Sequence, residues 1–185
     1  MMNNIPDFQS LMLPFLKLVQ DGRTHTLNDI YEKLCIEYNL SQEDKEALLP
    51  SGNQAIMMNR VGWTRTYLKK AGLISSPQRA NFVITQQGRQ ILESSPTRID
   101  VAYLKKLPVF QEWIASYNST TPKSKLTDVD NFEIPQVTPS ELIETGYVQM
   151  NDSLSFDLLE KMKQLTDKQF EHLVLKVHKP VKLTT

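Results

Sequence analysis

The chain has 185 residues, of which 40% are hydrophobic, and its 21 basic and 21 acidic side chains give a formal net charge of zero. This balance excludes a histone-like polycation or an acidic tail as the main role of the chain. The single cysteine, Cys35, excludes an internal disulfide and a zinc site with several cysteines. No run approaches the roughly 20 consecutive apolar residues of a membrane span, and no secretory signal is visible, so we expect a soluble, cytoplasmic protein with no membrane partner.

The neutral total conceals an uneven distribution of charge. Residues 55–98 carry seven basic side chains and one acidic side chain, Glu93, whereas the segments on either side are net negative. A focused positive region suits a polyanion such as a nucleic acid. The alternative is that these side chains only solvate one face of a domain, and charge alone leaves both interpretations open.

Three helices are predicted in the first part of the chain. Apolar residues at helical spacing over 11–19 indicate the first, which Pro14 either kinks or delays. The second begins after a cap at Thr26, and its apolar face includes Cys35, which we therefore expect to be a buried, inert thiol. Ser41 caps a short third helix.

The strongest helical pattern covers residues 55–71 and ends at Gly72, in a C-cap position. A short strand at 73–74, a polar turn and a returning strand at 82–85 follow it. The order of three helices, strand, turn and strand is that of a winged helix-turn-helix. In that arrangement the helix before the hairpin enters the DNA major groove, and the hairpin tip reaches a phosphate or the minor groove.

A polar segment separates this region from a second helical region. Residues 118–137 lack periodicity and are interpreted as a linker. The strings Thr138-Pro-Ser-Glu141 and Thr166-Asp-Lys-Gln169 are capping boxes that predict helix starts. We therefore expect a mainly α fold with a small β-hairpin. Its expected parts are a winged-helix domain at 1–117, the linker at 118–137, a helical region at 138–178 and a tail at 179–185.

The predicted helix over 55–71 has a core side and an outward face. At about 100° per residue, Met57, Val61 and Leu68 share the core side. The outward face and its borders carry amide, hydroxyl, indole, amine and guanidinium groups. Amines suit phosphates, asparagine pairs with adenine and arginine pairs with guanine. Together with an arginine at the hairpin tip, the candidate DNA-binding residues are Asn59, Arg60, Trp63, Arg65, Thr66, Lys69, Lys70 and Arg79.

Structural explanations stay open beside these functional ones. Trp63 either packs on a base methyl or a sugar, or turns to cover an adjacent helix. Lys69 and Lys70 are also consistent with a solvated surface, and Arg79 with an ordinary polar turn. Gly62 removes a side chain at a point where a backbone would approach DNA closely.

The strings Ile5-Pro-Asp-Phe-Gln-Ser-Leu-Met-Leu-Pro14, Leu48-Leu-Pro-Ser-Gly52 and Asn59-Arg-Val-Gly-Trp-Thr-Arg-Thr-Tyr-Leu-Lys-Lys-Ala-Gly-Leu-Ile74 resemble the N-terminal domain of the Mrr restriction endonuclease family. The similarity covers about residues 5–92. In that family this domain is a winged helix that targets DNA, and the restriction enzymes act on modified, typically methylated, foreign DNA. The resemblance implies double-stranded DNA as the partner, with methylated DNA as the typical target in the family. It also implies a recognition surface at 59–70, with Trp63 beside a 5-methyl group as a hypothesis.

The resemblance continues after the expected linker, where 138–143 and 165–174 are similar to the helices that lead into the family's nuclease domain. In the family a mixed sheet follows, with acidic groups and a Glu/Gln-x-Lys segment that hold Mg²⁺. Residues 177–185 stand in its place here. The resemblance thus implies a truncated endonuclease with no catalytic residues and no metal ligands. Mg²⁺ is expected as a cofactor only if a partner completes a nuclease site.

The sequence leaves several functions open. The leading hypothesis is a DNA-binding winged-helix protein of a restriction system. The alternatives are a nuclease subunit completed by a partner chain, a winged helix that binds protein, and the product of a decayed restriction gene. The apolar face predicted over 139–177 would pack back on residues 1–117, fray, or form a homodimer.

Overall fold

The structure is a computed structural model that describes residues 4–78, 80–120 and 137–177. The expected tail at 179–185, the candidate residue Arg79 and residues 121–136 of the expected linker lie outside the described residues, whereas residues 118–120 belong to a helix and not to a linker. The chain separates into two compact units, Met1–Leu142 and Ile143–Thr185. We refer to them as unit 1 and unit 2.

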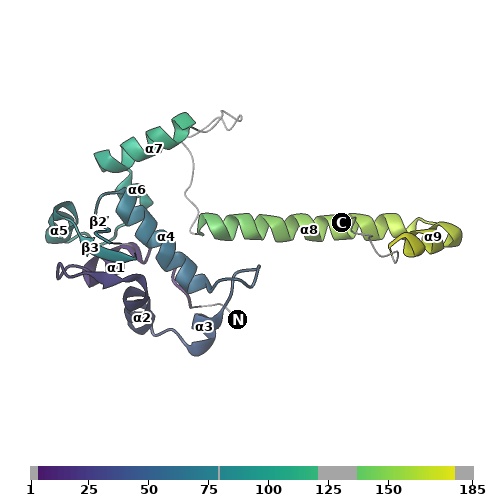
Figure 1. Ribbon diagram of the computed structural model, residues 1–185, viewed down its shortest axis with the longest axis horizontal. Helices are drawn as coiled ribbons and strands as arrows, with labels where there is room; N and C mark the ends of the chain where they lie inside the picture. Colours follow the sequence, from purple (N-terminus) through teal and green to yellow (C-terminus); the bar gives the residue numbers. More distant parts are fainter. Residues whose placement is uncertain (1–3, 79, 121–136, 178–185) are drawn as a thin grey trace, which may run out of the picture. The chain divides into compact units, whose positions relative to one another are not determined.

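Unit 1 is a helical domain with a small sheet (Figure 1). Its elements are, in chain order, α1 (Met12–Leu18), β1 (His25–Thr26), α2 (Leu27–Glu37), α3 (Gln42–Glu46), α4 (Ile56–Lys70), β2 (Ile74–Ser75), β3 (Asn81–Ile84), α5 (Gln86–Glu93), α6 (Val101–Leu104) and α7 (Pro108–Thr120). The prediction of a mainly α fold with a small β-hairpin is confirmed.

The described sheet has three antiparallel strands in the order β1-β3-β2. In the hairpin, Ile74 pairs with Ile84, whereas on the other edge of β3, His25 pairs with Phe82. The hairpin was predicted, but β1 was not, because a strand of two residues is too short to show an alternating pattern. The sheet places β3 in the middle and fixes the hairpin directly after α4.

Local capping explains where the helices begin. The Thr26 hydroxyl accepts from the Asp29 backbone N–H, and the Asp29 carboxylate accepts from the Thr26 backbone N–H, which completes a capping box at the start of α2. Hydrogen bonding to the Thr26 side chain, and then to the Thr26 backbone N–H, lowers the pKa of the Asp29 carboxyl. Ser41 starts α3 in the same way. Pro14 falls in the first turn of α1, where its missing N–H has no helical partner to lose.

The core of unit 1 lies where α1, α2, α4 and α7 meet. Its largest fully buried side chains include Phe8, Phe15 and Phe110. Cys35 is also buried there, and this burial raises the pKa of its thiol, as expected for an inert cysteine. At Gly88 in α5, an added Cβ would lie 2.3 Å from the Leu73 carbonyl oxygen, so α5 packs directly on the hairpin backbone.

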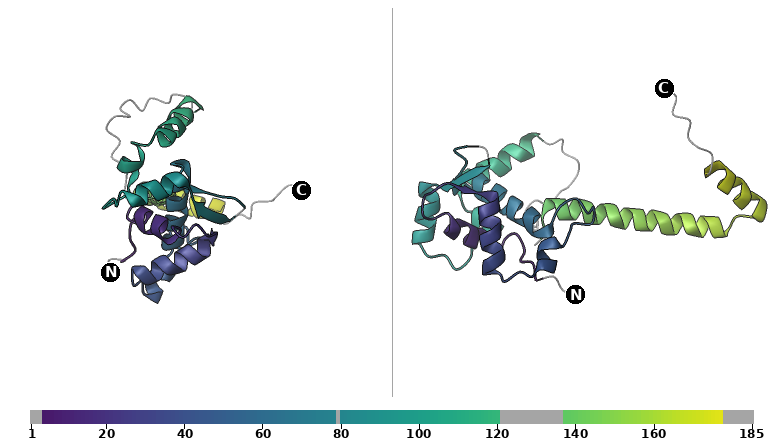
Figure 2. Two further views of the ribbon diagram at one scale, coloured as in Figure 1. Left: turned by 90° about the vertical axis from the view of Figure 1, so that its left-hand side faces the viewer. Right: turned by 60° about the horizontal axis from the view of Figure 1, so that its bottom comes forward.

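The helix α8 (Pro139–Lys163) begins in unit 1 and continues into unit 2, where α9 (Asp167–Val177) follows it. The right view of Figure 2 draws α8 as one uninterrupted helix. Many of its apolar side chains are exposed, namely Leu142, Ile143, Tyr147, Val148, Met150, Leu154, Phe156, Leu158 and Leu159. Among the helices that the structure describes, none is both long and apolar enough to span a membrane.

Candidate nucleic-acid interface

The helix α4 packs its predicted core side into unit 1. Met57, Val61, Thr64 and Leu68 are buried, and the Thr64 hydroxyl donates to the backbone carbonyl of Phe8 at 2.7 Å. The opposite side of α4 is divided into two flanks with different surroundings. These flanks contain all the candidate DNA-binding residues except Lys70, at the end of α4, and Arg79.

We call Gly62, Arg65, Thr66 and Lys69 the open flank. Lys69 is exposed, and Arg65 and Thr66 are partly exposed. The guanidinium carbon of Arg65 lies 5.5 Å from the ring centroid of Phe82, which ties this side chain to strand β3. The Thr66 hydroxyl donates to the Gly62 carbonyl at 2.9 Å and accepts from Arg65. Lysine, arginine and threonine side chains therefore lie along one accessible strip beside the hairpin.

Gly62 is the unusual member of the open flank. Glycine inside a helix costs about 1 kcal/mol relative to alanine. A Cβ at this position would meet nothing within 4 Å, so packing within the described residues does not require glycine here. The missing side chain instead leaves the α4 backbone open to a close approach from outside the chain.

The other side of α4, which we call the covered flank, consists of Asn59, Arg60, Trp63 and Tyr67. Arg60 is enclosed by two segments distant in sequence. Its Nε and Nη2 atoms donate to Oε1 of Glu141 at 3.0 and 2.7 Å. Its Nη1 atom donates to the carbonyls of Ile5 at 2.8 Å and Pro6 at 3.1 Å. Every guanidinium nitrogen of Arg60 is thus engaged within unit 1.

Asn59 and Trp63 contact the same turn of α8. The Asn59 Oδ1 atom accepts from the Thr138 hydroxyl at 2.7 Å, and its Nδ2 atom donates to Gln54 at 3.0 Å. The Trp63 indole N–H donates to the Ser140 hydroxyl at 3.1 Å. Thr138 and Glu141 also form the predicted capping box, because each backbone N–H donates to the other side chain.

The expectation that Asn59 faces outward is wrong, because it is only 4% exposed beneath Thr138. Helical periodicity places Asn59 opposite the core, but residues 138–141 form a second layer there. For Trp63, the geometry matches the alternative in which the indole covers an adjacent helix. From the sequence, Glu141 was recognisable only as a capping residue. The sequence signal for the contact between Arg60 and Glu141 was that Arg60 is a charged residue with no acidic partner nearby on its own helix.

Further along the covered flank, α7 packs on α4 through aromatic rings. Tyr67 lies 6.0 Å from Phe110 and 6.3 Å from Trp113, measured between ring centroids. Burial raises the pKa of Tyr67. Lys70 is exposed at the border of this cluster, and its Nζ atom lies 5.5 Å from the centroid of a Trp113 ring.

The residues around Arg79 form a hydrogen-bonded turn. The Ser76 hydroxyl donates to the carbonyls of Gln78 at 3.0 Å and Asn81 at 2.9 Å. Ala80 has a positive φ of 64°, which reverses the chain before β3. The described residues 76–78 and 80 thus form part of the turn between β2 and β3.

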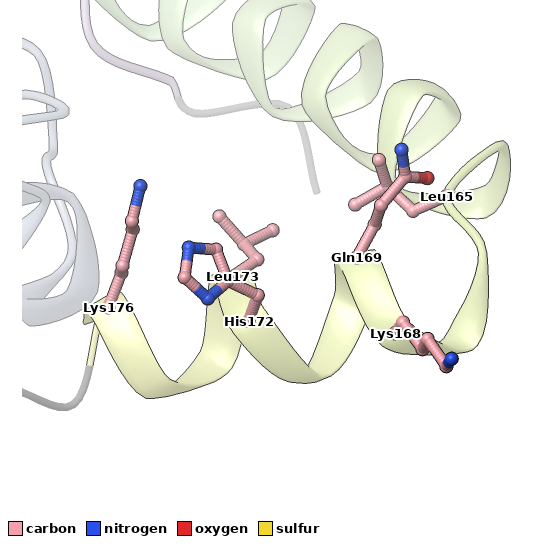
Figure 3. A pocket seen from close by; sticks show the side chains of 6 residues that line it. All are labelled: Leu165, Lys168, Gln169, His172, Leu173 and Lys176. Atoms are coloured by element: carbon pink, nitrogen blue, oxygen red, sulfur yellow. The ribbon is translucent and has the colours of Figure 1, made fainter.

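Metal-binding groups and pockets among the described residues would also bear on the chemistry of the chain. In the part of the chain that the structure describes, no group of three or more His, Cys, Asp and Glu side chains could hold a metal ion. A shallow hollow of about 540 Å³ in unit 2 is lined by Leu165, Lys168, Gln169, His172, Leu173 and Lys176 (Figure 3). Its lining contains lysine and histidine but no carboxylate.

Comparisons with known proteins concern the part of unit 1 that contains α4. Residues 8–94 match the family model of the Mrr N-terminal domain, so this part of the chain is similar to that domain. The chain is also 23% identical over 177 residues to the type IV methyl-directed restriction enzyme EcoKMrr of Escherichia coli (strain K12). That similarity covers 94% of this chain and 58% of the enzyme. No solved structure matches the chain significantly.

These comparisons confirm the predicted resemblance to the Mrr restriction family. The matched domain contains all of α4, the hairpin and α5. By contrast, α7 and residues 138–141, which cover one flank of α4, lie outside the matched domain. The chain spans 58% of the length of its curated relative.

Proposed function

We propose that this chain is a DNA-binding winged-helix component of a restriction system, and that α4 is its recognition helix. The observation that carries the proposal is the open flank of α4. This flank joins basic and hydroxyl side chains to an otherwise unexplained glycine, directly before a hairpin. The strand order β1-β3-β2, with α4 leading into β2, supports the winged-helix assignment.

Each residue has a distinct role in the proposed complex. Lys69 and Lys70 neutralise phosphates, which supplies affinity for any sequence. Arg65 and Thr66 reach base edges in the major groove, and Gly62 lets a DNA strand or base edge approach the helix backbone. Arg79 contacts a phosphate or the minor groove from the hairpin tip. Asn59, Arg60 and Trp63 belong to the same proposed set but contact residues 138–141 in this structure.

We propose methylated double-stranded DNA as the preferred partner. The support is the similarity to a methyl-directed restriction enzyme, which extends over nearly the whole chain. The proposal assigns DNA binding, and not cleavage, to the described residues. A nuclease site completed by a partner chain is the alternative, and it would appear as Mg²⁺-dependent cleavage only in the presence of that partner.

A homodimer is proposed through the C-terminal helices. The support is the set of exposed apolar side chains on α8, among them Ile143, which is 74% exposed, and Phe156, which is 64% exposed. A dimer would pair two winged helices on one duplex. Light scattering should give twice the chain mass of 21.3 kDa. A monomeric mass across the concentrations used for DNA binding would contradict this proposal.

Fluorescence anisotropy with matched unmethylated and 5-methylcytosine duplexes at two salt concentrations tests the function. We expect salt-dependent binding with a preference for the methylated duplex. Lys69→Ala combined with Lys70→Ala should weaken binding to all duplexes and reduce the salt slope by about 1–2. Lys105→Ala with Lys106→Ala removes the same charge from exposed lysines outside α4 and serves as the control.

The outcomes separate the parts of the proposal. Equal affinity for both duplexes would retain DNA binding and remove the methyl preference. An unchanged affinity and salt slope in the Lys69/Lys70 variant would remove α4 as the interface. No binding to either duplex at low salt would favour a winged helix that binds protein.

A further inference from the structure

We infer that residues 138–141 form an autoinhibitory latch over the base-reading part of α4, and that DNA must displace this latch to bind with full affinity. The inference rests on the proposed DNA-binding function of α4. Its basis is that the first turn of α8 engages Asn59, Arg60 and Trp63 through the same atoms that would contact DNA. The latch and a fully engaged duplex therefore exclude each other.

The Glu141 carboxylate binds the Arg60 guanidinium where a DNA phosphate or guanine would bind in the proposed complex. Two guanidinium nitrogens of Arg60 converge on one carboxylate oxygen of Glu141, at 2.7 and 3.0 Å. Guanidinium groups bind carboxylate and phosphate oxygens with the same donor geometry, and they bind guanine with the same paired N–H groups. Glu141 therefore acts as an internal mimic of the anionic partner.

Asn59 is blocked at both of its hydrogen-bonding atoms. An asparagine reads adenine by accepting a hydrogen bond at Oδ1 and donating one from Nδ2. In this structure Oδ1 accepts from Thr138 and Nδ2 donates to Gln54. The base-reading edge of Asn59 is therefore saturated while the latch is closed.

The latch covers the part of α4 where base recognition is expected. In helix-turn-helix proteins, the N-terminal residues of the recognition helix contact base edges. The residues that the latch engages, at positions 59, 60 and 63, lie in the first half of α4. The open flank offers mainly the second half, with Arg65, Thr66 and Lys69. The closed protein thus presents phosphate contacts more fully than base contacts.

The composition of the latch suits a reversible contact. The latch is one helical turn that contacts α4 through hydrogen bonds of polar side chains. Among the described residues, no buried side-chain nitrogen or oxygen lacks a hydrogen-bond partner. The next two residues, Leu142 and Ile143, are 46% and 74% exposed, so apolar packing does not anchor the turn. DNA offers replacement partners for the same α4 groups, which makes exchange feasible.

Thr138→Ala combined with Glu141→Ala opens the latch and tests the inference. Apparent affinity falls in proportion to the population of the competent state, so we expect the open variant to bind DNA about 5- to 10-fold more tightly. Adding Asn59→Ala should remove that gain, whereas Asn59→Ala alone should have little effect. Glu160→Ala removes the same negative charge from an exposed site later in α8 and should leave affinity unchanged.

A second measurement uses the unsubstituted latch. The chain has two tryptophans, so Trp113→Phe leaves Trp63 as the sole indole reporter. Saturating DNA should shift the Trp63 emission, because Ser140 leaves the indole N–H. This readout does not depend on the open variant being stable.

The two measurements distinguish failure of the latch from failure of the proposed function. If wild-type protein binds DNA, the inference is overturned when the folded open variant binds no more tightly than Glu160→Ala. It is also overturned when Trp63 emission stays constant at saturation. If no variant binds DNA at all, the proposed function fails and the latch inference fails with it.

Discussion

The two flanks of α4 carry similar polar and basic side chains, but their surroundings give them different roles. On the covered flank, Arg60 is held by four hydrogen bonds to segments at both ends of unit 1. On the open flank, Arg65 contacts the neighbouring Thr66 hydroxyl and the Phe82 ring. The difference teaches that one helix can be occupied by distant segments of its own chain along one flank and remain open to a ligand along the other.

The largest expected effect is on stability, from Arg60→Ala. This change removes the donors of the Ile5 and Pro6 carbonyls and the partner of Glu141. Leaving buried polar groups without partners should lower the free energy of unfolding by about 2–3 kcal/mol. Urea unfolding followed by circular dichroism measures this loss.

Arg65→Ala is the matched substitution on the open flank. It removes a guanidinium group that lies over Phe82, a contact worth about 0.5–1 kcal/mol at a partly exposed site. We therefore expect a change in the free energy of unfolding well below that of Arg60→Ala. Similar losses from the two substitutions would remove the distinction between the flanks.

For DNA binding, the order should reverse. Arg65→Ala should weaken affinity by about 10-fold, because a base-edge contact by arginine is worth roughly 1–3 kcal/mol. Anisotropy titrations at fixed salt measure the change. Arg98→Ala is the control, since Arg98 is an exposed arginine outside α4 that pairs with Asp100 at 3.4 Å. If both variants lose affinity equally, only the total charge matters.

Local features of unit 1 could be predicted from the sequence because they depend on neighbouring residues. The caps at Thr26 and Ser41 each act within three positions, and so does the capping box from Thr138 to Glu141. The core side of α4 followed from its helical period. The resemblance to the Mrr family, which extends the interpretation to DNA, depended on long strings such as 59–74.

The division of α4 into two flanks could not be predicted in the same way. Asn59 is covered by Thr138, which lies 79 positions further along the chain. A helical wheel identifies the side that faces the core but contains no information on a second layer formed by a distant segment. Asn59 and Thr66 are therefore equivalent by periodicity, and only the tertiary structure separates them.

The smallest expected effects come from Gly62→Ala, which should raise the stability of unit 1 but lower its affinity for DNA. A Cβ at Gly62 meets nothing within 4 Å, so the change should stabilise unit 1 by about 0.5–1 kcal/mol through higher helix propensity. If DNA approaches the α4 backbone at this point, the added methyl group should weaken binding by about 2- to 10-fold, the equivalent of one hydrogen bond. Thermal or urea unfolding and anisotropy measure the two effects separately.

Gly146→Ala provides a matched control for this prediction. Gly146 lies inside α8, and a Cβ there also meets nothing within 4 Å, so alanine should favour the helix without touching the proposed interface. A gain in stability with unchanged DNA affinity is the result expected for Gly146→Ala alone. If Gly62→Ala behaves in the same way, the glycine has no role in close approach, and the interface must lie further toward Lys69 and the hairpin tip. Loss of affinity in the more stable Gly62→Ala protein would instead place the duplex against the α4 backbone, because a general weakening of the fold could not produce it.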